Sequence, residues 1–68
     1  MAIDKKKVGK RLEALRGKRT QREIAELIGV TPAAISQYEN GERMPADDIK
    51  IKLSVLYKRS VATIFFAD

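Results

Sequence analysis

Residues 20–41 read TQREIAELIGVTPAAISQYENG, and this stretch decides the fold. Thr20 and Glu23 have the spacing of a capping box, in which each side chain binds the other residue's backbone amide at a helix start. Gly29 supplies a residue that adopts a left-handed turn without a steric penalty. The stretch therefore begins with a predicted short helix over about 20–28, which ends at a glycine.

A second short helix is predicted over about 31–40. Thr31 can cap its first turn, and Pro32 is tolerated there because the N–H that proline lacks has no partner in a helix's first turn. Asn40 and Gly41 close the helix. The side chains predicted to point toward the core are Ala34, Ile35 and Tyr38.

The outer face of this second helix is small, polar and uncharged, with Ala33, Ser36 and Gln37. Two short helices joined through a glycine match the helix-turn-helix unit, whose second helix enters the major groove of DNA. Short side chains let such a helix approach the bases, and amides or hydroxyls match the donors and acceptors on base edges. Taken alone, Ser36 and Gln37 are more typical of an ordinary solvent-exposed surface.

The helix that precedes this stretch is predicted to begin after Asp4 and to end near Arg16. Gly17 is expected to stop it in the left-handed conformation. Its apolar stripe consists of Val8, Leu12 and Leu15. In the helix over 20–28, the predicted buried face consists of Ile24, Leu27 and Ile28.

Two helices are predicted after the stretch, a fourth that begins near Asp47 and ends near Lys58, and a short fifth over 61–66. The apolar positions assigned to the fourth helix are Ile49, Ile51, Leu53, Val55 and Leu56. No segment alternates like a strand over a useful length. The sequence thus predicts one all-α domain over residues 1–68, a compact bundle of five short helices.

Positive charge is concentrated near the N-terminus. The chain of 68 residues has a net charge of +5, yet residues 5–22 alone carry nine basic side chains against the single acid Glu13. That segment therefore carries +8, which suggests a polyanionic partner, although a solvated helix face accounts for charge alone equally well. A membrane surface is a poorer partner, because the apolar residues of this segment are needed in the core.

Composition argues against catalysis. The chain contains no His and no Cys, and it has no Gly-rich phosphate loop or cluster of metal ligands. We therefore expect no enzyme activity, no cofactor, no metal and no small-molecule ligand. The lack of Cys fits a reducing cytoplasm, and no apolar run reaches the length of about 18 residues that a membrane span needs.

The pattern TQ-x-EIA-x-x-IGVT-x-x-x-IS-x-YE-x-G over residues 20–41 resembles the Xre-type, lambda-repressor-like family of helix-turn-helix DNA-binding proteins. The resemblance covers about residues 8–66. It implies a five-helix fold and a sequence-specific transcriptional regulator, expected to be a repressor. Such a regulator would bind double-stranded DNA as a homodimer on a two-fold operator.

The resemblance also implies roles for individual residues. It places Ala33, Ser36 and Gln37 at the positions that read bases, with Pro32 beside them. Thr31 is added to this set because its methyl group can contact a thymine methyl. For the DNA backbone, the resemblance implies contacts from Gln21, which also caps its helix, and from Asn40 and Arg43. We also expect backbone contacts from the basic residues Arg19 and Arg22. A partly buried salt bridge is implied between Arg16 and Glu39.

The chain departs from the family pattern in three places. The link between Arg16 and Thr20 is about two residues short, which favours an earlier end of the first helix. Arg19 stands where many members have an apolar residue, and Lys58-Arg59 replaces a common Gly-Val. A Lys in a left-handed position costs on the order of 1 kcal/mol.

A dimer surface is expected at the C-terminal helix, from Ile64, Phe65 or Phe66. The two phenylalanines are adjacent, so they cannot both face one core, and the second either contacts another subunit or folds over the bundle edge. Two alternatives belong to the class of interaction proteins: an antitoxin that also binds its own promoter, and the N-terminal domain of a longer repressor. The absence of a long disordered tail argues against the antitoxin.

Overall fold

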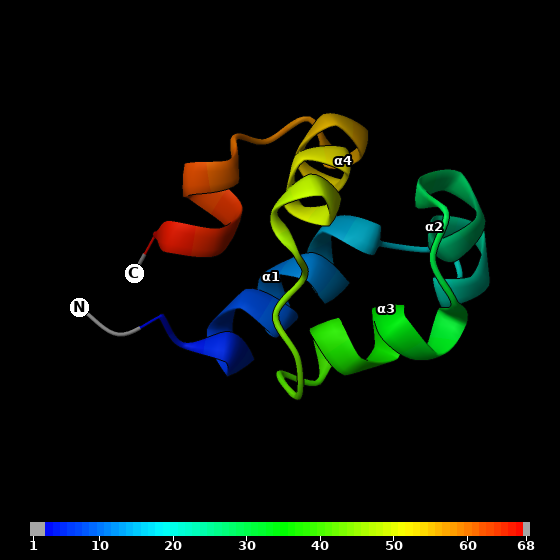
Figure 1. The fold of residues 1–68 in the computed structure, drawn as a ribbon, viewed down its shortest axis with the longest axis horizontal. Coiled ribbons are helices and arrows are strands. Elements are labelled where there is room, and N and C mark those ends of the chain that lie inside the picture. The colour runs from blue at the N-terminus through cyan, green and yellow to red at the C-terminus, as the bar shows by residue number, and fades with distance from the viewer. Residues whose placement is uncertain (1–2, 68) are drawn as a thin grey trace.

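A computed structural model describes residues 3–67, and within them all regular secondary structure is helical (Figure 1). Its elements are α1 (Lys5–Arg16), α2 (Gln21–Ile28), α3 (Pro32–Glu39), α4 (Asp47–Tyr57) and a final π-helical turn, η1 (Ala62–Phe66). The predicted all-α architecture of five short helices is confirmed. No helix within residues 3–67 is both long enough and apolar enough to cross a membrane.

The helix starts follow local side-chain chemistry. Asp4 caps α1 by accepting hydrogen bonds from the amides of Lys6 and Lys7, at 2.9 and 3.2 Å. At α2, both halves of the predicted capping box between Thr20 and Glu23 are formed. These bonds satisfy amides that have no partner inside the helix, so α1 and α2 begin directly after their capping residues.

The first helix continues to Arg16, so the short link to Thr20 does not end it early. Gly17 stops it, but with φ 62° and ψ −129°, which is outside the left-handed helical region that the sequence predicted. That prediction was wrong in its detail, because the tight link to α2 bends the chain further. Only glycine adopts such angles readily.

Figure 1 shows α1 at the centre of the bundle, with α3 below it and with α4 and η1 above it. Helix α1 packs on α3 and η1, and α2 packs on α3 and α4. The buried side chains that fill the space between them are Val8, Leu12, Ile24, Ala25, Ile28, Ala34, Ile35, Tyr38, Leu53, Tyr57, Ile64 and Phe65.

Helix α1 approaches the end of α3 closely because residue 9 is a glycine. A Cβ added at Gly9 would overlap the carbonyl oxygen of Glu39 and lie 2.8 Å from that of Tyr38. The backbones of the two helices therefore touch at this point, and any larger side chain would push them apart.

Three side chains assigned to the core from sequence lie outside it. Leu27, Ile51 and Val55 are 62%, 58% and 72% exposed. At 100° per residue, Ile51 and Val55 project from the side of α4 opposite to Leu53, and Leu27 lies beyond the buried stripe of α2. They line a groove of about 400 Å³ between α2 and α4 instead.

Candidate nucleic-acid interface

The turn between α2 and α3 has the geometry that the sequence predicted. Gly29 adopts the left-handed conformation, with φ 76° and ψ 36°. Its amide and that of Val30 both donate to the carbonyl of Ala25, at 2.9 and 3.0 Å. Thr31 then caps α3 by accepting a hydrogen bond from the amide of Ala34 at 3.1 Å. These three hydrogen bonds hold the turn that joins α2 to α3.

Helix α3 divides into two faces, as expected. Ala34, Ile35 and Tyr38 are buried. The five residues predicted to read bases are exposed apart from Ser36, which is half-buried; they are Thr31, Pro32, Ala33, Ser36 and Gln37. The structure therefore brings these five side chains to one exposed surface at and beyond the N-terminus of α3.

The C-terminal end of α3 is closed by a Schellman motif. Gly41, with φ 73°, donates its amide to the carbonyl of Tyr38 at 3.2 Å. The amides of Glu42 and Arg43 both donate to the carbonyl of Gln37, at 2.9 and 3.3 Å. The backbone carbonyl of Gln37, whose side chain faces outward from α3, therefore also anchors the loop that carries Arg43.

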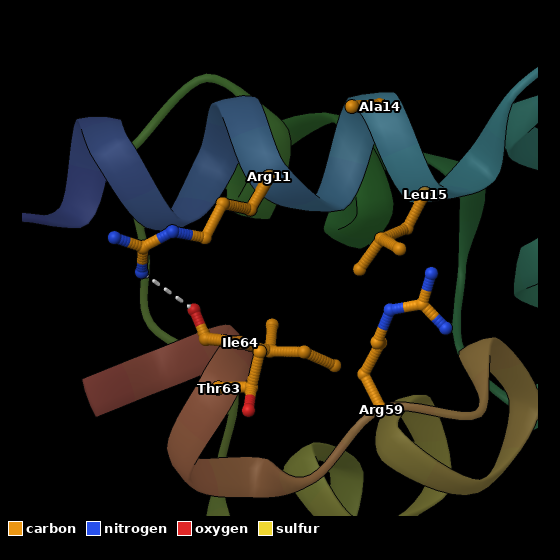
Figure 2. Close-up of a pocket in the computed structure, with 6 residues that line it drawn as sticks. All are labelled: Arg11, Ala14, Leu15, Arg59, Thr63 and Ile64. Atoms are coloured by element: carbon orange, nitrogen blue, oxygen red, sulfur yellow. Dashed lines mark hydrogen bonds between the residues drawn. The ribbon is translucent and has the colours of Figure 1, made fainter. Parts of the chain in front are cut away.

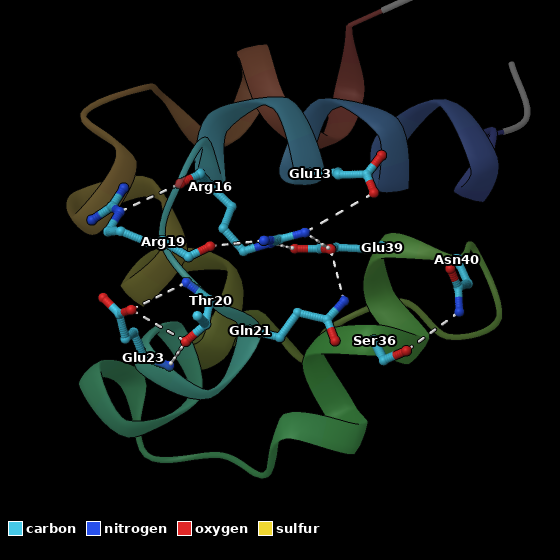
Figure 3. Close-up of polar contacts among 9 residues, drawn as sticks. All are labelled: Glu13, Arg16, Arg19, Thr20, Gln21, Glu23, Ser36, Glu39 and Asn40. Atoms are coloured by element: carbon cyan, nitrogen blue, oxygen red, sulfur yellow. Dashed lines mark hydrogen bonds and ion pairs between the residues drawn. The ribbon is translucent and has the colours of Figure 1, made fainter.

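A polar network joins the first three helices beneath this surface (Figure 3). The Nε and Nη2 atoms of Arg16 donate to the two carboxylate oxygens of Glu39, at 2.8 and 3.1 Å. Gln21 donates its Nε2 to the same carboxylate at 3.0 Å. The predicted salt bridge is confirmed, and the hydrogen bond to Glu39 raises the pKa of the Arg16 guanidinium.

Gln21 differs from its expected role at the helix start. Thr20, not Gln21, supplies the side-chain cap of α2, so that part of the prediction was wrong. The Nε2 of Gln21 carries two N–H groups, and Glu39 accepts only one of them, so the second N–H can still donate. Gln21 can therefore keep its hydrogen bond to Glu39 and still offer one N–H to a phosphate.

Arg19 also has a partner inside the protein. Its guanidinium lies 5.5 Å from the centre of the Tyr57 ring, and its Nε donates to the carbonyl of Arg16 at 3.5 Å. The apolar residue common at this position in the family is thus replaced by a cation stacked on an aromatic ring. Burial, aided by the charge of Glu39, raises the pKa of Tyr57 to about 12.

The remaining residues expected to contact the DNA backbone lie at the start of α2 and just after the end of α3. Arg22 is exposed on the first turn of α2. Asn40 follows α3 directly, where its Nδ2 donates to the hydroxyl of Ser36 at 3.4 Å (Figure 3). Arg43 is exposed, and its guanidinium lies 5.9 Å from the centre of the Tyr38 ring.

The proposed dimer residues need a correction. Ile64 and Phe65 are each only 1% exposed, because they fill the core between η1 and the rest of the bundle. Figure 2 shows Arg11 of α1 donating to the carbonyl of Ile64, at 2.9 Å, beside a cavity of about 230 Å³. Both side chains are therefore part of the monomer's own core and are not available for a subunit contact. Of the three residues, only Phe66 is exposed, at 53%.

Two residues near the interface were missed from the sequence. Gly9 lies where α1 touches α3, and Lys6 lies against Gly41 in the loop after α3. A glycine inside a predicted helix was the only available signal for the first, and Lys6 was not distinguishable from its basic neighbours. Among the described residues, no group of His, Cys, Asp and Glu side chains is placed to hold a metal ion.

Comparison with known proteins agrees with this geometry. The helix-turn-helix family model HTH_3 matches residues 10–64. The P22 c2 repressor, solved in complex with a synthetic operator, is 30% identical, covers 90% of this chain and 96% of its own, and superposes with a TM-score of 0.85.

Two further regulators have similar structures. The restriction-modification controller protein C.AhdI from Aeromonas hydrophila is 26% identical, with coverage of 91% of this chain and 93% of its own and a TM-score of 0.80. The clp gene regulator ClgR from Corynebacterium glutamicum is 25% identical, with coverage of 93% and 69% and a TM-score of 0.79. The search of curated protein sequences gave no significant match.

Proposed function

The chain belongs to the Xre-type, lambda-repressor-like helix-turn-helix family, and from this premise we propose that it represses transcription as a homodimer on a two-fold operator. It is a sequence-specific regulator that binds double-stranded DNA. The family and the similar structures are regulators and not enzymes. A regulator must reach the DNA that it controls, so we also propose a cytoplasmic location.

One observation carries the base-reading part of the proposal. The exposed face of α3 presents short or uncharged polar side chains, and hydrogen bonds hold both ends of the helix, the Thr31 cap at its start and the Schellman motif at its end. Gln37 has an amide that can bind adenine through two hydrogen bonds. The methyl groups of Ala33 and Thr31 suit contact with the methyl group of thymine. No charged side chain on this face keeps the helix away from the groove.

Contacts to the DNA backbone are proposed on both sides of that face. Arg22 on α2, with Asn40 and Arg43 after α3, would bind phosphates and fix the position of α3 in the groove. Arg19 and Gln21 also have donors to offer, but each is half-buried and held by an internal contact, Arg19 by the Tyr57 ring and Gln21 by Glu39. We therefore assign the larger backbone contribution to Arg22 and Arg43.

The two-fold arrangement follows from size. A single module of 68 residues buries little DNA surface, and a dimer on half-sites about 34 Å apart doubles the contact. We propose that Phe66 contributes to the subunit contact, since its side chain is large, apolar and exposed. Phe66→Glu should then weaken dimerisation, measured by analytical ultracentrifugation over a range of concentrations.

Val55→Glu provides the matched control for this test, because Val55 is also exposed and apolar but lies in the groove between α2 and α4. It should leave the dimer intact. If Val55→Glu separates the subunits and Phe66→Glu does not, the subunit contact lies in that groove and the assignment of Phe66 is wrong.

Base reading is tested by comparing two variants on specific and random duplexes. Gln37→Ala should lower affinity for the preferred sequence by roughly 5- to 100-fold, as the loss of one bidentate base contact implies, and should change random duplex binding little. Arg43→Ala should weaken both duplexes by the same factor. Equal loss on both duplexes for Gln37→Ala would contradict a base-reading role.

A further inference from the structure

The first helix carries positive charge that the helix-turn-helix does not use. Four lysines lie exposed along it, and none is among the residues assigned above to base or phosphate contacts; they are Lys5, Lys6, Lys7 and Lys10. Charges on a solvated helix face need no further explanation. One of these lysines, however, is held against the DNA-facing loop by its packing.

Lys6 lies directly on Gly41. A Cβ added at Gly41 would be 2.9 Å from both the Cα and the Cγ of Lys6, so the lysine stem covers the backbone of the loop. This approach depends on Gly9, one turn further along α1, which lets α1 touch the carbonyl oxygen of Glu39 at the end of α3. The first turn of α1 therefore projects past the end of α3.

The loop beneath Lys6 is the one that carries Asn40 and Arg43. Arg43 is tied to α3 by the hydrogen bond from its amide to the carbonyl of Gln37, at 3.3 Å. Lys6, which comes from α1, therefore lies against Gly41 in the segment that connects Asn40 to Arg43. Its flexible four-carbon stem ends in a point charge with three donors, which suits a phosphate at variable geometry.

We propose that Lys6 is an additional phosphate-binding residue, which lengthens the contact of the protein with the DNA backbone beside Arg43. The proposal rests on the proposed DNA-binding function. Phosphate contacts position a protein and add to its affinity without reading sequence. Lys6 would therefore strengthen binding to every duplex equally, and the effect would diminish as salt rises.

Lys7 is the matched control. It is the next residue, its amide is also bonded to Asp4, and it carries the same charge. A rotation of 100° per residue turns its side chain away from that of Lys6. A general attraction between a basic helix and DNA would involve both lysines alike, whereas a phosphate contact at the loop would involve Lys6.

The test measures the dependence of DNA affinity on salt for the wild type, Lys6→Gln, Lys7→Gln and Arg43→Ala. Glutamine keeps most of the stem over Gly41 and removes the charge. Lys6→Gln should reduce the slope of log affinity against log salt by about 0.9 per protomer, as loss of one phosphate contact predicts. Lys7→Gln should reduce it by less than half as much.

Ethylation interference locates the contact. Lys6→Gln should lose interference at one phosphate, adjacent to the phosphate whose interference is lost in Arg43→Ala. Equal slopes for the two lysine variants, or an unchanged ethylation pattern in Lys6→Gln, would overturn the proposal. If the wild type shows no salt-dependent binding to DNA, the proposed function itself fails, and that result is distinct from both others.

Discussion

Arg16 and Glu39 form a two-point ion pair that ties the end of α1 to the end of α3. The Nε–Oε2 and Nη2–Oε1 distances are 2.8 and 3.1 Å, and the whole Glu39 residue is only 8% exposed. Gln21 completes the set of donors around the carboxylate. Each hydrogen bond offsets part of the cost of removing the charge from water.

Arg16→Met should destabilise the fold strongly. It leaves the Glu39 carboxylate buried with Gln21 as its remaining side-chain donor, and such a loss costs about 3–5 kcal/mol. Guanidinium denaturation measures the change in the free energy of unfolding. The double variant Arg16→Met/Glu39→Leu should recover much of the loss, because it removes the buried charge as well. A double variant that is no more stable than Arg16→Met would contradict this account.

Gly9→Ala should lower stability although alanine favours helices. The substitution improves helix propensity by about 1 kcal/mol, but the added methyl overlaps the backbone oxygen of Glu39. Since backbone cannot rotate away as a side chain can, α1 must shift from α3. Thermal unfolding provides the measurement, with Lys10→Ala as the control on the exposed side of α1. A higher melting temperature for Gly9→Ala would show that the helices are not in contact there.

Lys58→Gly should stabilise the protein. Lys58 ends α4 in the left-handed conformation, with φ 57° and ψ 43°, as its place in the sequence suggested. Glycine removes the Cβ strain, worth about 1 kcal/mol, and this gain exceeds the added freedom of the unfolded chain. Lys58→Ala keeps a Cβ and should give no such gain. The free energies of unfolding of both variants decide the point.

Stability should fall in alkaline solution through Tyr57. Burial raises its pKa from 10.0 to about 12, so the folded state keeps the phenol neutral where the unfolded chain ionises. The stability that the neutral Tyr57 phenol contributes to the folded state is fully present below pH 10 and is lost as the pH rises from 10 toward about 12. Between pH 9 and about pH 11, the wild type should therefore lose more stability than Tyr57→Phe. Equal losses measured by denaturation would contradict the buried phenol.

Features set by neighbouring residues were predictable from the sequence. The caps at Asp4, Thr20 and Thr31 and the turn at Gly29 each depend on contacts within one helical turn, so the spacing of residue types was sufficient. The division of α3 into buried and exposed faces follows from its period in the same way. The Arg16–Glu39 pair was available only through the resemblance to a family.

Features set by the packing of distant segments were not predictable. Whether Leu27 or Val55 is covered depends on which sides of α2 and α4 meet, and their apolar character does not decide it. Ile64 and Phe65 were assigned to a surface because nothing in the sequence shows that η1 folds back onto α1. The contact between Lys6 and Gly41 likewise joins segments far apart in the chain.

The most direct test of the central claim is selection from a pool of random duplexes at about 150 mM salt, near physiological ionic strength. Sequencing of the retained fraction should give a two-fold motif whose half-sites are about 34 Å, one helical turn, apart. The same selection with Gln37→Ala should lose its preference at one base position in each half-site. A retained pool with no enriched motif, bound in a salt-dependent way, would contradict sequence-specific recognition by α3.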